Sequence, residues 1–200
     1  MERIGIMGGT FDPIHSGHLA MAEAALEQVE LDKVLFMPSK TPPHKRHSDV
    51  TGERERAEMV QCAISYNPRF EFSDFELKRY GLTYTADTLA LLQQQKPDCV
   101  WYFIMGGDSF FHVEKWYHPE EILRLSTILA VSRDGLSQEE MERQKAFLEE
   151  KYQAKIQLLS MPQMDISSTE IRSKIALGDE VCDMVPESVM TYIDEHGLYR

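Results

Sequence analysis

Two glycines and two histidines near the start of the chain form the pattern with the clearest chemical meaning. Gly8 and Gly9 follow a short apolar run, and because they lack a Cβ they let the backbone approach a ligand closely. His15 and His18 lie where a helical pattern begins, and the N–H groups and dipole of a helix N-terminus attract anions. The arrangement predicts a phosphate-binding site.

Two other interpretations of the histidines stay open from this local pattern. As metal ligands, His15 and His18 would need further cysteine, histidine or carboxylate ligands, and the sequence has no H-E-x-x-H or similar set. Alternatively, one or both rings only cap or pack the start of the helix. Phosphate binding needs no more than the glycine turn and the helix start.

A second candidate for anion binding lies near the C-terminal end of the chain. Ser167 and Glu170 fit a capping box, in which the serine is the N-cap residue. Arg172 follows within the first turn and a half, where its guanidinium can reach a phosphate bound at the helix N-terminus. A capped helix without a ligand gives the same serine and glutamate pattern, so it is the arginine that favours a polyphosphate site.

Three further segments each have a functional and a structural interpretation. The loop from Lys40 to Arg46 carries three cations and is stiffened by two adjacent prolines, and it suits either a lid over a nucleotide or a solvated surface loop. Trp116 and Tyr117 suit either an aromatic platform for a flat ring or core packing. Thr85 begins a helix whose N–H groups suit a carboxylate or a phosphate, or it simply caps that helix.

The sequence lacks the signatures of covalent catalysis. It contains neither a G-x-S-x-G motif nor a Cys–His signature, and neither a P-loop nor a G-x-G-x-x-G motif. A site rich in phosphate-binding groups but without a nucleophile favours phosphoryl or nucleotidyl transfer through positioning and charge neutralisation.

The elements that must position these residues alternate between strands and helices. Near-continuous apolar runs are typical of strands that are covered on both faces of a parallel sheet. The alternation predicts an α/β fold with a Rossmann-like, doubly wound parallel sheet and C-terminal helices, in a single domain over residues 1–200. Ligands of such sheets bind beyond the carboxyl ends of the strands, so the polar turns there, such as Gly106–Asp108, are expected to form one rim. The predicted strands cover residues 3–7, 33–37, 70–73, 99–105, 127–131 and 155–159, and the predicted helices cover about 17–29, 53–66, 84–95, 118–125, 137–152, 168–177 and 186–195.

Composition and charge narrow the class of protein. The chain has 200 residues and a formal net charge of −12, which argues against a broad basic face for nucleic acid. Three widely spaced cysteines suit a reducing compartment, and no apolar run approaches the ~20 residues that span a bilayer. We therefore expect a cytoplasmic protein without a signal peptide that binds neither nucleic acid nor a membrane.

Taken together, the motifs resemble those of a known family. The segment from Gly8 to His18 is similar to the (T/H)-x-G-H region of the nucleotidyltransferase superfamily, and residues 166–172 resemble its second signature, I-S-S-T-x-I-R. With residues 42–45, 83–88 and 106–108 and with Trp116, the order of motifs resembles that of the bacterial nicotinate-nucleotide adenylyltransferases over nearly the whole chain.

The resemblance implies a reaction and its partners. The family transfers AMP from ATP to nicotinate mononucleotide, which gives nicotinate adenine dinucleotide (deamido-NAD) and pyrophosphate. Mg²⁺ is expected as the cofactor, held mainly by ATP oxygens and water. The expected partners are thus ATP and nicotinate mononucleotide, and assembly into a homodimer is left open.

The resemblance also implies roles for individual residues. His18 would stabilise the charge that develops near the α-phosphate, and Trp116 would stack on the pyridine ring. The residues implied for catalysis are His15, His18, Lys40, Arg46 and Arg172. Those implied for ATP binding are Gly8, Gly9, Thr10, Phe11, His15, His18, Ile166, Ser167, Ser168, Thr169 and Arg172. Those implied for the acceptor are Thr85, Asp108, Trp116, Tyr117 and Arg133.

Three alternatives stay open. A pantetheine-phosphate adenylyltransferase would share the two ATP motifs but not the features at Trp116 and Thr85. A nicotinamide-dependent oxidoreductase would share the strand–glycine–helix start, although the third glycine of its signature is missing. A non-catalytic nucleotide sensor would bind ATP without releasing pyrophosphate.

Overall fold

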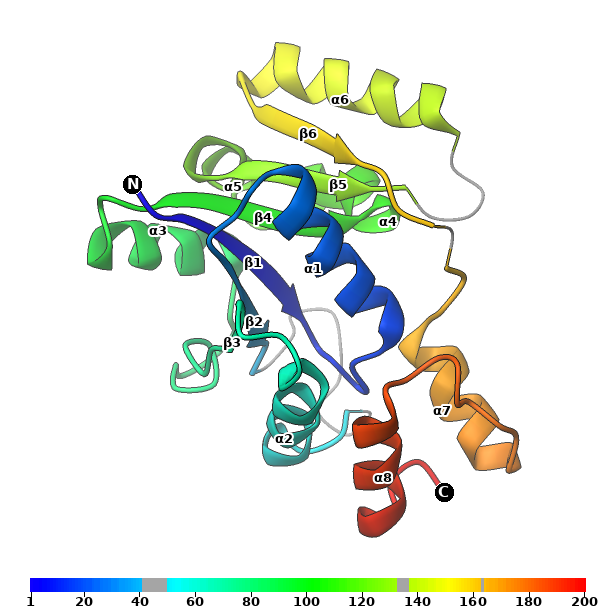
Figure 1. The fold of residues 1–200 in the computed structure, drawn as a ribbon. Helices are drawn as coiled ribbons and strands as arrows, with labels where there is room; N and C mark the ends of the chain where they lie inside the picture. Colours follow the sequence, from blue (N-terminus) through cyan, green and yellow to red (C-terminus); the bar gives the residue numbers. More distant parts are fainter. Residues whose placement is uncertain (41–49, 133–136, 163) are drawn as a thin grey trace.

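A six-stranded parallel sheet runs through the computed structural model, which describes residues 1–40, 50–132, 137–162 and 164–200 (Figure 1). The strand order is β3-β2-β1-β4-β5-β6, so the predicted doubly wound parallel sheet is confirmed. The order reverses between β1 and β4, and this is the point where sheets of this kind bind ligands. The strands are β1 Arg3–Gly9, β2 Lys33–Pro38, β3 Phe70–Phe72, β4 Val100–Gly106, β5 Thr127–Val131 and β6 Lys155–Leu159.

Helices cover both faces of this sheet. Helices α1, α2, α7 and α8 contribute to one apolar core, and α3, α5 and α6 contribute to the other. Successive strand residues alternate between the two cores, so that Ile6 packs on the α3 side and Met7 on the α1 side. The helices are α1 Ser16–Gln28, α2 Glu53–Ile64, α3 Thr85–Gln95, α4 Gly107–His112, α5 Pro119–Leu125, α6 Gln138–Tyr152, α7 Ser168–Leu177 and α8 Glu187–His196.

One predicted turn is the start of a helix. Strand β4 runs to Gly106, and α4 begins at the next residue and continues into a short 3₁₀ helix, η2 Val113–Lys115. The segment is too short to show a helical period, and glycine at its start lowers the helix propensity, so the pattern predicted a turn. Asp108 therefore lies in the first turn of α4.

The C-terminal helices α7 and α8 lie beyond the arrowhead of β1 in Figure 1. Within the described part of the chain, no helix has both the length and the apolar character that crossing a bilayer requires.

Gly5 is needed where α1 and its connection pack on the centre of the sheet. A Cβ at this position would lie 2.9 Å from Leu31 Cδ1, 3.1 Å from Val34 Cγ2 and 3.2 Å from Ile104 Cδ1. All three neighbours are buried, so they have little room to move. The absence of a side chain at Gly5 sets how closely these elements approach.

Replacing Gly5 with alanine is expected to lower the free energy of unfolding by about 1–3 kcal/mol, because the new methyl group overpacks this core. Gly8→Ala is the matched control, since its Cβ would meet only the Phe103 ring at 3.6 Å, an ordinary contact. Urea-induced unfolding of the two variants measures the difference. Equal stability of the two variants would contradict the close packing at Gly5.

Candidate active site

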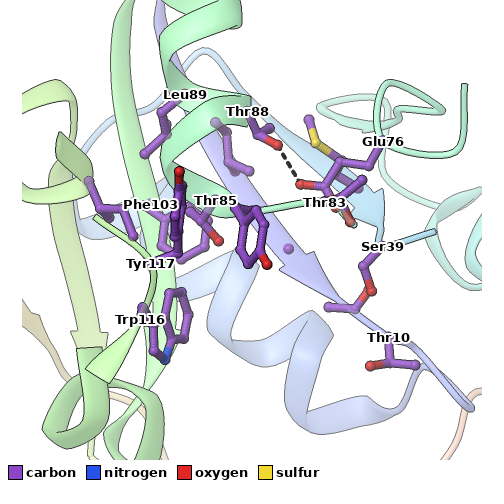
Figure 2. A pocket seen from close by; sticks show the side chains of 16 residues that line it. Thr10, Ser39, Glu76, Thr83, Thr85, Thr88, Leu89, Phe103, Trp116 and Tyr117 are labelled. Atoms are coloured by element: carbon purple, nitrogen blue, oxygen red, sulfur yellow. Dashed lines mark hydrogen bonds between the residues drawn. The ribbon is translucent and has the colours of Figure 1, made fainter. Parts of the chain in front are cut away.

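Two adjoining pockets lie at the carboxyl ends of β1 and β4. Both are lined by Gly8, Phe103 and Trp116, so the two pockets meet at these residues. The first, which we call the histidine pocket, has a volume of about 820 Å³ including open solvent and is lined by His15, His18, Asp108, Ser109, Ser167 and Ser168 among others. The second, which we call the aromatic pocket, has a volume of about 880 Å³ including open solvent and is lined by Thr10, Ser39, Glu76, Thr85, Trp116 and Tyr117 among others (Figure 2).

The two histidines are stacked at the start of α1. Their ring centroids are 3.7 Å apart with the planes inclined by 30°, and the backbone N–H of His15 donates to His18 Nδ1 at 3.3 Å. Because Nδ1 accepts this bond, the neutral imidazole of His18 carries its proton on Nε2. His15 is only 3% exposed, whereas His18 is partly exposed. His18 is therefore the better placed of the two to donate to a ligand oxygen.

The packing around these rings explains residue types in the turn before α1. A Cβ on Gly17 would lie 3.1 Å from His15 Nδ1, a contact tight enough to displace the imidazole, so glycine favours a helix start beside this ring. The Phe11 ring packs edge-on against His18 with centroids 5.1 Å apart, and a Cβ on Gly9 would lie 3.2 Å from that ring. Phe11 has a φ of 52°, a strained left-handed conformation that its burial maintains.

The N-terminus of α7 faces the same pocket. Ser167 caps the helix, as predicted, because its Oγ accepts from the backbone N–H of Glu170 at 3.1 Å. The Glu170 carboxylate lies 3.5 Å from Lys174 Nζ, and Ser168 Oγ donates to the carbonyl of Pro13 at 2.9 Å. The second predicted motif thus contacts the first one directly.

Arg172 strengthens this connection between the two motifs. Its Nη1 donates to the backbone carbonyl of Asp12 at 2.7 Å, and its Nη2 lies 3.5 Å from Thr169 Oγ1. Part of the guanidinium therefore holds α7 to the turn between β1 and α1. Ile166, which precedes the cap, is buried beside this turn, with its Cβ 4.0 Å from the position of a Cβ on Gly17.

The aromatic pocket is built around the start of α3. The rings of Tyr84 and Tyr117 lie 4.3 Å apart, and Thr85 is the first residue of the helix. The Tyr84 side chain does not cap the helix. Trp116 is partly exposed and packs edge-on against Phe103 with centroids 6.1 Å apart. Its position between two pockets differs from that of a core tryptophan such as Trp101, which is buried in the sheet.

The cationic residues expected at the rim are described only in part. Lys40 follows β2, and its Nζ lies 5.5 Å from the centroid of the Tyr80 ring. The remainder of the predicted lid, including Arg46, lies outside the described residues, and so does Arg133. The segments after β1, β2, β4 and β6 line the two pockets, as expected for one rim, whereas Ser132, after β5, is not among the described residues that line them.

A buried arginine that sequence reasoning missed holds these loops together. Arg56 of α2 is 1% exposed, and its Nη1 donates to the carbonyl of Thr10 at 2.7 Å. Its Nε donates to the carbonyl of Thr51 at 3.0 Å, and its Nη2 lies 3.5 Å from the carbonyl of Lys40. Burial lowers the pKa of Arg56, and the negative charge of Asp12 opposes this shift.

Asp12 forms the second part of this buried arrangement. It is 2% exposed, and its carboxylate accepts from the Tyr199 hydroxyl at 2.7 Å and from the Thr51 backbone N–H at 3.4 Å. Burial, together with the charge of Asp12, raises the pKa of Tyr199 above its ordinary value.

One feature of the sequence could have predicted that Arg56 is buried. Arg56 lies four residues before the buried Val60, and therefore on the apolar side of an otherwise charged helix.

With this geometry established, comparison with known proteins gives the family. A family model described as cytidylyltransferase-like matches residues 6–174. A probable nicotinate-nucleotide adenylyltransferase of Lachnoclostridium phytofermentans is 46% identical over 199 residues, with both chains covered completely. The corresponding protein of Clostridium tetani is 40% identical over 200 residues, again with complete coverage of both.

The chain belongs to the cytidylyltransferase-like family and, within it, to the nicotinate-nucleotide adenylyltransferases. The family resemblance of the motifs is therefore confirmed. The fold agrees with that of solved structures. Nicotinic acid mononucleotide adenylyltransferase of Plasmodium falciparum complexed with APC has a TM-score of 0.81 at 19% identity, covering 100% of this chain and 98% of that chain. The same protein complexed with NaAD has a TM-score of 0.83 at 20% identity and equal coverage.

The Arg56 contacts give a test of how this adenylyltransferase maintains its site. Replacing Arg56 with lysine is expected to lower the free energy of unfolding by about 2–4 kcal/mol, because an ammonium cannot reach three separate carbonyls and leaves buried acceptors unpaired. Urea-induced unfolding at neutral pH measures this loss.

Arg54→Lys on the same helix is the matched control. The Arg54 side chain is 84% exposed and pairs with Glu58, so its replacement is expected to change stability by less than about 0.5 kcal/mol. Equal losses at the two positions would show that Arg56 does not hold the loops.

Proposed function

We propose that this adenylyltransferase transfers AMP from ATP to nicotinate mononucleotide and releases nicotinate adenine dinucleotide and pyrophosphate. The observation that carries the proposal is the junction of the two pockets at Gly8, Phe103 and Trp116. The histidine pocket offers histidines, hydroxyls and the starts of α1 and α7. The aromatic pocket offers aromatic rings and the start of α3. A nucleotide in each pocket would bring their phosphates together near Gly8.

In this proposal ATP occupies the histidine pocket. Its triphosphate lies between the start of α1 and the start of α7, where the helix N–H groups and the hydroxyls of Ser167 and Ser168 can donate to phosphate oxygens. Thr169, beside Arg172, extends the set of hydroxyls, whereas Thr10, which the resemblance also assigns to ATP, lines the aromatic pocket. The Arg172 contact to Asp12 keeps the two helix starts at a fixed separation. Asp108 of α4 lines the histidine pocket, although the resemblance assigns it to the acceptor, whose ribose it is proposed to bind.

Nicotinate mononucleotide occupies the aromatic pocket. The pyridine ring would stack on Trp116, and its carboxylate would accept from N–H groups near Thr85 and Tyr117. Tyr117 is 48% exposed and lies against Tyr84, so it forms an edge of the pocket rather than part of the core. Such stacking would cover the partly exposed Trp116 ring.

The reaction proceeds by direct in-line attack of the mononucleotide phosphate on the α-phosphorus of ATP. A bond forms between the attacking oxygen and phosphorus, and the bond to pyrophosphate breaks. The nucleophile is already an anion, so no strong general base is needed. The protein must instead bring two anions together, and donors such as His18 Nε2–H stabilise the negative charge that develops on the α-phosphate oxygens.

Mg²⁺ is proposed as the cofactor, carried by ATP. Among the residues that the structure describes, no three histidine, cysteine, aspartate or glutamate side chains gather where they could hold a metal ion. The hydroxyls and the single carboxylate of Asp108 in the histidine pocket suit an ion that keeps its water and phosphate ligands. Such an ion would neutralise charge on the triphosphate.

The cytoplasmic location, the single domain, the lack of nucleic-acid binding and the homodimer stay predictions.

His18→Ala is expected to lower kcat about a hundredfold with little change in the KM for ATP, because the lost donor acts mainly on charge that develops in the transition state. His196→Ala, on α8, serves as the control and is expected to leave kcat unchanged. The steady-state rate of pyrophosphate release at varied ATP concentration gives kcat and KM for both variants. A near-normal kcat for His18→Ala would remove His18 from this role.

The reaction itself is tested by product analysis. With ATP and Mg²⁺, the protein is expected to convert nicotinate mononucleotide to the dinucleotide much faster than nicotinamide mononucleotide, and to leave phosphopantetheine unreacted. Mass spectrometry of the product and pyrophosphate detection measure this, and a chelator in excess of Mg²⁺ is expected to stop the reaction. Consumption of phosphopantetheine alone would refute the assignment.

A further inference from the structure

Glu76 is a buried acid in the wall of the aromatic pocket that the proposed reaction does not use. It belongs to the segment between β3 and α3 and is 8% exposed. Among the described residues that line this pocket, it is the one carboxylate. A carboxylate beside a pocket for an anionic ring would repel the ring, unless hydrogen bonds from the protein compensate the negative charge.

Hydrogen bonds direct this carboxylate toward α3. Thr88 Oγ1 lies 2.7 Å from Glu76 Oε1, as the dashed line in Figure 2 shows, and Arg79 Nη1 donates to the same hydroxyl oxygen at 2.8 Å. Because the hydroxyl oxygen of Thr88 accepts from Arg79, its single proton is donated to Glu76. The bonds therefore run in one direction, from the guanidinium through the hydroxyl to the carboxylate.

The same contacts attach the segment before α3 to the first turns of that helix. Arg79 Nη2 lies 3.8 Å from the Asp87 carboxylate, and Asp87 and Thr88 are the third and fourth residues of α3. Burial raises the pKa of Glu76, and the hydrogen bond from Thr88 opposes that rise. Removing the hydroxyl would thus leave a buried acid without one of the donors that compensate its burial.

The start of α3 is also the part of the aromatic pocket best suited to an anion. Thr83, Tyr84, Thr85 and Thr88 all line the pocket, and the Tyr84 side chain packs on Tyr117 instead of capping the helix. Thr88 therefore borders the pocket and also contacts Glu76 and Arg79. These contacts attach the helix start to the segment before it.

We propose that Glu76 is a positioning residue that, through Thr88, fixes the start of α3 and so sets the preference for an acceptor ring carrying a carboxylate. This proposal rests on the proposed function. In the proposed reaction, Glu76 does not touch the reacting atoms. Its effect is on acceptor binding, and the histidine pocket is left unchanged.

The first test compares Glu76→Ala with Glu76→Gln. The alanine variant is expected to raise the KM for nicotinate mononucleotide about tenfold or more, the size expected when a buried hydrogen-bond partner is removed. The KM for ATP is expected to stay within about twofold, and the ratio of activity with nicotinate over nicotinamide mononucleotide is expected to fall. Glu76→Gln is expected to restore both values, because its amide oxygen can still accept from Thr88.

A second pair of variants covers the case in which Glu76→Ala fails to fold. Thr88→Val removes the hydroxyl with little change of shape and is expected to give the same acceptor-selective defect, while Thr88→Ser retains the hydroxyl and is expected to give a smaller rise in the KM for the acceptor. Asp74→Ala is the control in the same segment, since its exposed carboxylate pairs only with Lys78, at 2.8 Å, in the contacts described. It is expected to leave both KM values unchanged.

Binding of nicotinate mononucleotide alone, followed by tryptophan fluorescence, gives a readout that does not depend on turnover. Equal rises in the KM for both substrates, or a loss of stability with an unchanged KM for the acceptor, would overturn the proposal. A Glu76→Gln variant as impaired as Glu76→Ala would also overturn it, because the charge and not the positioning would then matter. Failure of the proposed function itself is distinct, since the parent protein would then form no dinucleotide.

Discussion

The turn between β1 and α1 keeps its shape because arginine side chains from distant parts of the chain hydrogen-bond its backbone. Arg56 holds the carbonyl of Thr10, and Arg172 holds that of Asp12. Two guanidinium groups thus satisfy carbonyls that an irregular buried loop would otherwise leave unpaired. The stacked imidazoles, the contact with α7 and the junction of the two pockets all depend on this turn.

The division of the site follows from the topology of the sheet. Because the strand order reverses between β1 and β4, the loops after these strands diverge toward opposite faces. The α1 and α7 side supplies histidines and a capped helix start, whereas the α3 side supplies aromatic rings. Phe103 and Trp116 border both pockets, so a ligand in one pocket contacts the wall of the other. This suits a reaction that joins two nucleotides.

The sequence could predict features that are local. Apolar runs located every strand, and the glycine–histidine and serine–arginine motifs located the two helix starts, because each pattern reflects neighbours along the chain. The helix at Gly107 was missed because six residues show no period. Arg56, Tyr199 and Glu76 were missed because their partners lie far away in sequence or on another element. Their roles depend on tertiary contacts, which a single sequence does not reveal.

The bond from Tyr199 to Asp12 joins residues 187 positions apart. During synthesis, Asp12 leaves the ribosome 187 residues before its phenolic partner. Until Tyr199 emerges, the acid lacks this donor. In this fold, completion of the turn between β1 and α1 thus depends on a residue that is translated 187 positions after Asp12.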